Sequence, residues 1–277
     1  MALNVVERQI ADQLGLDTNT CSTIAQGENS RVTRLGEWVI KTAPRQATSF
    51  QFQKEADALR TLSVHGISVP EVLCATDRCI VMRYHAHHPP SVSDFQQLGH
   101  SLAKLHLTRC LPKTEPDTFF LGRLELPTMS IEDHWPQYFV QTLLQGLAEK
   151  AHSQGHRLDF LNLTMIDLSK IEAQPICRIH GDLWMGNLLP TKDGIFLIDP
   201  AGSLGVRGLD LAMLQMFGEP PPSFWHAYTK TYPIDPDTRA SLNLYQLYYA
   251  LAHVVLFGKS YIPLCQSLWK QSPRNGL

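Results

Sequence analysis

The segment that decides the fold of this chain is Ile179-His-Gly-Asp-Leu-Trp-Met-Gly-Asn187, followed by Phe196-Leu-Ile-Asp199. Within the first run, Asp182 precedes Asn187 by five positions. In catalytic loops for phosphoryl transfer, this spacing lets the acidic residue orient an acceptor hydroxyl while the asparagine reaches a metal ion. The pattern therefore predicts Asp182 as the base of a phosphoryl-transfer site.

Asp199 ends an apolar run, where a carboxylate without a partner would be costly to bury. The dipeptide Asp193-Gly194 predicts a tight hairpin, which would bring Asn187 and Asp199 to one end of a two-stranded sheet. Mg²⁺ takes few protein carboxylates and relies on the oxygens of bound phosphates. We therefore predict that Asn187 and Asp199 hold Mg²⁺ together with ATP. The alternative is a simple turn at residues 180–182 and a strand-ending cap at Asp199. That interpretation does not explain why the Asp182–Asn187 spacing and Asp199 occur together in the order that a phosphoryl-transfer site requires.

Lys41 ends an apolar strand, a position where a lysine ordinarily faces solvent. Glu55 shares a helical face with Phe52 and Leu59, so its carboxylate lies in the stripe expected to be buried. A buried carboxylate needs a cation, and Lys41 is the natural candidate. We predict that Lys41 pairs with Glu55 and contacts the nucleotide phosphates.

A candidate phosphate loop, Ala25-Gln-Gly-Glu-Asn-Ser30, lies between two expected strands upstream of Lys41. Backbone N–H groups near Gly27, Asn29 and Ser30 are expected to contact phosphate. Because the loop contains a single glycine, an ordinary β-turn is an equally good interpretation.

The pattern of the chain changes near residue 85. The first part predicts a small β-rich lobe, with helices over about 4–14 and 49–64, Ser49 as a possible N-cap of the second, and the strand Cys79–Met82. The second part predicts a mostly helical lobe, with helices that include 95–105, 135–151 and 242–257. We therefore expect an α+β, two-lobed, protein-kinase-like fold, with an ATP-binding lobe at 1–84 and a catalytic and acceptor-binding lobe at 85–277.

The composition of the chain limits the classes of partner that it is expected to bind. The chain has 277 residues, 44% hydrophobic and 18% charged, with a formal net charge of −2. With this net charge, the chain lacks the excess of basic residues that would attract nucleic acid. No stretch approaches the roughly 18 apolar residues of a spanning helix, so we expect a cytoplasmic protein without a membrane partner, either a monomer or a weak homodimer.

Histidines and cysteines do not indicate a zinc site. The six cysteines are scattered without metal-ligand spacing, so free thiols are expected. His85, His87 and His88 precede Pro89-Pro90 at the break between the lobes, which favours a solvated linker.

These residues, in this order, resemble the fructosamine (ketosamine) kinase family, within the aminoglycoside phosphotransferase/choline kinase-like superfamily. The runs that carry the resemblance are His180-Gly-Asp-Leu-Trp-Met-Gly-Asn187, Asp199-Pro-Ala201, Asp210-Leu-Ala-Met213, Phe217-Gly218 and Leu244-Tyr-Gln-Leu-Tyr248. The Trp184 form of the catalytic loop is the part specific to the family. The resemblance implies ATP binding at a hinge formed by Met82, Arg83 and Tyr84, and phosphorylation of a sugar hydroxyl on ketosamines, a deglycation repair reaction.

The acceptor site is where the chain departs from the family. The family usually has a Tyr-Gly-His-x-Glu-like run after Asp-Pro-Ala, whereas this chain has Leu204-Gly-Val206-Arg-Gly208. The resemblance implies that Trp184 forms the floor of the acceptor cleft and that Leu204, Val206 and Gly208 form one wall. Because Val206 and Gly208 would remove polar partners there, we expect activity on small ketosamines such as ribulosamines, with loose selection of the amine.

Two other functions are compatible with the motifs. One is a kinase for another small acceptor, such as an aminoglycoside, choline, homoserine or a thioribose. The other is a nucleotide-binding pseudokinase, a class that typically lacks a base or a metal ligand. Here Asp182, Asn187 and Asp199 are all present.

Overall fold

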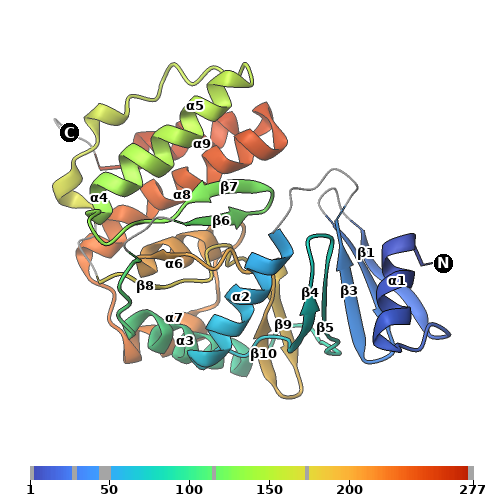
Figure 1. Ribbon diagram of the computed structural model, residues 1–277. Helices are drawn as coiled ribbons and strands as arrows, with labels where there is room; N and C mark the ends of the chain where they lie inside the picture. Colours follow the sequence, from blue (N-terminus) through green and yellow to red (C-terminus); the bar gives the residue numbers. More distant parts are fainter. Residues whose placement is uncertain (1–2, 27–29, 44–50, 114–116, 172–174, 274–277) are drawn as a thin grey trace.

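The computed structural model describes residues 3–26, 30–43, 51–113, 117–171 and 175–273, and shows two lobes (Figure 1). The N-terminal lobe is an antiparallel sheet with two helices, and the C-terminal lobe is mostly helical. The predicted α+β, two-lobed architecture is confirmed. No helix among the described residues is both long enough and apolar enough to cross a membrane.

The N-terminal lobe is built on a five-stranded sheet of order β1-β2-β3-β5-β4. Its elements are α1 (Val5–Leu14), β1 (Cys21–Gln26), β2 (Arg31–Leu35), β3 (Trp38–Thr42), α2 (Gln51–Val64), β4 (Val72–Ala75) and β5 (Cys79–Arg83). Because side chains alternate along a strand, Ile40 and Val81 pack with the residues of α1, whereas Ile80 and Met82 pack with those of α2. The proposed N-cap Ser49 lies outside the described residues.

The C-terminal lobe begins with α3 (Val92–Leu107), whose N-cap Ser91 forms a capping box with Asp94. Its elements are α3 (Val92–Leu107), β6 (Thr118–Leu121), β7 (Leu124–Pro127), α4 (Trp135–Gln137), α5 (Gln145–Ser153), β8 (Cys177–Arg178), β9 (Leu188–Thr191), β10 (Gly194–Leu197), β11 (Leu204–Gly205), α6 (Arg207–Met216), α7 (Pro222–Thr231), α8 (Pro236–Phe257) and α9 (Ile262–Gln271). A π-helical segment, Tyr138–Leu144, joins α4 to α5, so the expected long helix is continuous. Short 3₁₀ turns occur at Leu163–Met165, Leu168–Lys170, Met185–Asn187 and Lys259–Tyr261.

The core of the C-terminal lobe is arranged around α8, whose side chains are buried over most of its length. α8 packs against α5, α6 and α9. Near the hairpin, α3 and α7 pass so closely that a β-carbon on Gly99 would come within 2.6 Å of the Phe224 carbonyl oxygen. Glycine at position 99 therefore sets the distance between these two helices.

The predicted hairpin is present as β9 and β10, with Leu188 opposite Leu197. Gly194 begins β10 directly after the turn, opposite Thr191, with φ +115°, a conformation that favours glycine. The Ile198 N–H donates to the Asn187 carbonyl oxygen at 3.1 Å. The hairpin therefore brings Asn187 and Asp199 to the same end of the two-stranded sheet, as expected.

Candidate active site

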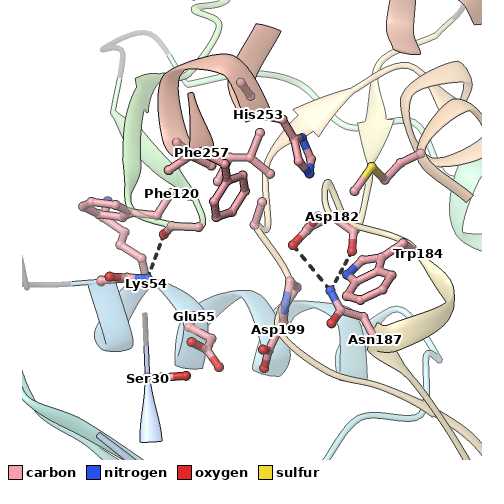
Figure 2. A pocket seen from close by; sticks show the side chains of 18 of the residues that line it. Ser30, Lys54, Glu55, Phe120, Asp182, Trp184, Asn187, Asp199, His253 and Phe257 are labelled. Atoms are coloured by element: carbon pink, nitrogen blue, oxygen red, sulfur yellow. Dashed lines mark hydrogen bonds between the residues drawn. The ribbon is translucent and has the colours of Figure 1, made fainter. Parts of the chain in front are cut away.

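A cavity of about 550 Å³ lies between α2, the loop after β8, the β6–β7 hairpin and the end of α8 (Figure 2). The side chains that line it include seven residues predicted from the sequence: Ser30, Lys41, Glu55, Asp182, Trp184, Asn187 and Asp199. Tertiary folding thus brings together residues that are up to 169 positions apart in the chain. Gly27 and Asn29, also predicted for this site, lie outside the described residues.

Lys41 forms two ion pairs at the edge of the cavity. Its Nζ lies 2.9 Å from both carboxylate oxygens of Glu55 and 3.0 Å from Asp199 Oδ1. Burial disfavours the ammonium, but the charges of Asp199 and Glu55 outweigh burial and raise the pKa of Lys41 above its ordinary value. The predicted Lys41–Glu55 pair is therefore present, and Asp199 is a second partner that the sequence pattern did not indicate.

Two carboxylates share this single ammonium, which leaves an excess of negative charge. Burial, together with the nearby Asp199 carboxylate, raises the pKa of Glu55 to about 7, although Lys41 opposes this shift. A cation brought in by a ligand would compensate the excess charge.

Asp182 and Asn187 are joined by their side chains. The Asn187 amide nitrogen donates to the Asp182 carbonyl oxygen at 2.8 Å and to Asp182 Oδ2 at 3.4 Å. Burial and the nearby Asp199 raise the pKa of Asp182 to about 7, against the opposing effects of Asn187 and Lys41. A carboxylate with this pKa is well suited to accept a proton near neutral pH.

Asp210 holds the backbone of the catalytic loop. Its carboxylate is fully buried and accepts hydrogen bonds from the N–H groups of His180 and Gly181, both at 2.8 Å. His106 Nε2 lies 3.2 Å from Asp210 Oδ2, while its Nδ1 is 2.9 Å from the Tyr228 hydroxyl. Sequence reasoning did not predict this anchor, although an aspartate within the otherwise apolar run Leu209–Leu214 was a usable signal.

The side-chain oxygen atoms of Asn187 and Asp199 are suitable ligands for Mg²⁺. The side-chain nitrogen of Asn187 donates a hydrogen bond to Asp182. The side-chain oxygen of Asn187 is therefore the atom available to a metal, together with the Asp199 carboxylate. Asp199 adopts φ +57°, which is uncommon for a residue other than glycine. Within the described ranges, no group of three or more His, Cys, Asp or Glu side chains could hold a metal. Two protein oxygens match an ion that completes its shell with phosphates and water.

Aromatic rings also line the cavity: His253 and Phe257 lie on the side away from Ser30 and Glu55, and Trp184 lies beside Asn187 (Figure 2). The Trp184 ring lies 6.2 Å from that of Phe217, and the ring of His253 lies 5.3 Å from Phe217 and 5.4 Å from Phe257. Trp184 was predicted at this site, but Phe217, His253 and Phe257 were not. Their helical spacing resembles that of ordinary core residues, so only their exposure in the structure identifies them.

The predicted wall of the acceptor cleft is wrong. Leu204, Val206 and Gly208 do not line the cavity. Leu204 pairs with Arg178 in the two-stranded β8–β11 sheet, Val206 is fully buried, and Gly208 lies in the buried part of α6. The chain after Asp199 runs back along β8 and directly into α6, so this segment packs beneath the catalytic loop.

The predicted hinge residues lie at the end of β5, outside the cavity described above. Met82 packs against α2, and Arg83 forms exposed ion pairs with Glu37 and Glu71. The N–H groups of Arg83 and Tyr84 donate to backbone carbonyl oxygens at 2.9 and 2.7 Å. The carbonyl oxygens of Arg83 and Tyr84 are therefore the backbone groups that could accept a hydrogen bond from a ligand bound at the end of β5.

Comparison with known proteins identifies the family. The family model described as fructosamine kinase matches residues 4–273. A probable ketoamine kinase of Thermus thermophilus is 34% identical over 249 residues, which span 88% of this chain and 89% of that protein.

Solved structures agree with this result. A putative fructosamine-3-kinase of Thermobifida fusca is 27% identical, with a TM-score of 0.81 over 98% of this chain and 99% of the other. An ADP-bound aminoglycoside phosphotransferase is 16% identical, with a TM-score of 0.65 over 97% of each chain, a likeness of fold alone. The chain therefore belongs to the fructosamine kinase family and is a phosphotransferase with a kinase-like fold.

Proposed function

We propose that this protein transfers the γ-phosphoryl group of Mg²⁺-bound ATP to a sugar hydroxyl of a small ketosamine, of the ribulosamine or fructosamine type. The observation that carries the proposal is the convergence of Asp182, Asn187, Asp199 and the Lys41–Glu55 pair on one cavity. The names of the relatives, a ketoamine kinase and a fructosamine-3-kinase, support the acceptor class.

In this proposal Asp182 accepts the proton of the attacking hydroxyl, since its carboxylate borders the cavity and its pKa lies near neutrality. Lys41, held in place by Glu55, binds a phosphate oxygen. Asn187 and Asp199 would hold Mg²⁺, which supplies positive charge to balance the phosphates. Asp210 positions the loop that carries Asp182.

We further propose that adenine binds beside Met82, Arg83 and Tyr84 and that Ser30, with Gly27 and Asn29, covers the phosphates. A cytoplasmic location and a monomeric or weakly dimeric state also remain our proposals. All six cysteines lie among the described residues and carry thiols rather than disulfides, which supports a reducing compartment.

Incubation of the purified protein with Mg²⁺-ATP and a free ribulosamine or fructosamine tests the reaction. We expect ADP release together with a gain of one phosphoryl group on the ketosamine, detected by mass spectrometry and ³¹P NMR. The variant Asp182→Asn serves as the matched control for contaminating kinases. Turnover of choline, homoserine or an aminoglycoside in the absence of ketosamine turnover would contradict the proposal.

A further inference from the structure

One end of the cavity carries aromatic surface that phosphoryl transfer does not use. Phe217 and Phe257 are 44% and 45% exposed, although most phenylalanines of the chain are buried. Tyr261 also lines the cavity, with its ring 4.8 Å from that of His253. Apolar rings gathered in a concave site are typical of a surface that a ligand covers.

His253 adds no positive charge to this end. Its Nδ1 lies 2.7 Å from the Tyr249 carbonyl oxygen in the same helix, so a protonated Nδ1 donates to that oxygen. Burial lowers the pKa of His253. The imidazole at the centre of the three rings is therefore neutral at neutral pH.

Acidic groups also line the cavity, and Asp182 lies near His253 and Trp184 (Figure 2). Among the described residues that line the cavity, the carboxylates are Glu55, Asp182 and Asp199. Glu55 and Asp199 contact Lys41, and Asp182 contacts Asn187. An ammonium group placed among the aromatic rings would therefore lose water while the nearby carboxylates already have partners. Cation–π attraction to the rings offsets only part of that cost.

Trp184 connects the two ends of the cavity. It follows Asp182 in the catalytic loop, and its ring lies 6.2 Å from the ring of Phe217. A sugar with a hydroxyl at Asp182 and one face against Trp184 would direct its amine substituent toward Phe217, whose ring neighbours that of Trp184.

We propose that Phe217, Phe257 and Tyr261, grouped around His253, form a subsite for the amine substituent of the ketosamine. This subsite selects uncharged, apolar substituents over substituents that carry a second ammonium group. The inference rests on the proposed function, because it assumes a ketosamine as acceptor. It replaces the argument for loose amine selection, which depended on Val206 and Gly208.

An isosteric pair of substrates tests the subsite. The ribulosamines made from n-pentylamine and from 1,4-diaminobutane differ only in a terminal methyl against a terminal ammonium. We expect kcat/KM to be at least about tenfold higher for the pentylamine derivative, in line with selection by apolar pockets. The ribulosamine made from methylamine, which is too short to fill the subsite, reports on the reaction itself.

Charge substitution at the rings provides the matched variants. In Phe257→Glu we expect the preference for the pentylamine derivative to shrink or reverse, whereas Phe257→Leu should retain it. Leu111→Glu places the same charge on a side chain that is 83% exposed and outside the cavity, and should leave the ratio at the wild-type value. Thermal melting of each variant checks that it is folded.

The outcomes separate the two proposals. Equal kcat/KM for the pentylamine and diaminobutane derivatives, or a preference that persists in both Phe257→Glu and Phe217→Glu, would overturn the subsite while leaving the kinase function intact. Failure to phosphorylate the methylamine derivative would overturn the proposed function instead. In that event, calorimetric binding of the same isosteric pair in the presence of Mg²⁺-ADP decides whether the rings prefer the apolar substituent.

Discussion

The indole of Trp184 lies against Gly186, so close that a β-carbon at position 186 would overlap the six-membered part of the ring. Gly186 has no special backbone conformation, because its φ is not positive. Its lack of a side chain is what allows the indole to lie flat across the turn that leads to Asn187. The Trp-x-Gly pattern therefore fixes the position of the indole beside Asp182, the proposed base.

Gly186→Ala should displace this indole. We expect KM for the ketosamine to rise about tenfold, because the sugar loses its stacking surface, while KM for ATP stays close to the wild-type value. Steady-state kinetics with each substrate varied in turn checks this split. Equal changes in both KM values would show that the substitution disturbs the whole loop, contrary to this interpretation.

Asp182→Asn should lower kcat by about 10² to 10⁴-fold, the usual contribution of a positioned acid or base. Because Asp182 acts on the acceptor hydroxyl, the affinity for ATP should change little. Single-turnover kinetics combined with nucleotide binding by calorimetry measures the two effects. Turnover near the wild-type rate would remove Asp182 from the role of base.

The pH dependence should reflect the raised pKa of Asp182. Activity requires the ionised base, so kcat/KM should increase with pH up to a plateau just above about 7. A folded pKa above the unfolded value of 3.8 means that the stabilisation from this group is complete below pH 3.8 and lost as pH rises through about 7. At pH 8 without ligand, Asp182→Asn should therefore raise Tm. A lower Tm for this variant at pH 8 would contradict the assigned direction of the pKa shift.

Asp199→Ala should abolish Mg²⁺-dependent turnover, because the proposed metal site loses its carboxylate. The same change removes the Asp199 charge that raises the pKa of Glu55, so the Lys41–Glu55 pair should persist. Activity titrated against Mg²⁺, with Asp199→Asn for comparison, tests the metal assignment. Wild-type turnover at ordinary Mg²⁺ concentrations would place the metal elsewhere.

The sequence alone determined the catalytic end of the site. The spacing of Asp182 and Asn187 and the Asp193-Gly194 dipeptide are local features. They predicted the hairpin, and with it the approach of Asn187 to Asp199, directly. Glu55 was predictable because a carboxylate in an apolar helical stripe requires a buried cation. The structure supplies that cation as Lys41.

Only the tertiary structure decided where the aromatic rings of the cavity lie. Phe217 follows α6, while His253 and Phe257 lie in the last turns of α8, and packing between these helices, rather than any local pattern, leaves their rings exposed in one cavity. The same packing buries Val206, because pairing of β11 with β8 turns the chain beneath the loop. Periodicity shows which face of an element is apolar. Whether that face meets the core or a ligand depends on contacts between segments distant in the chain.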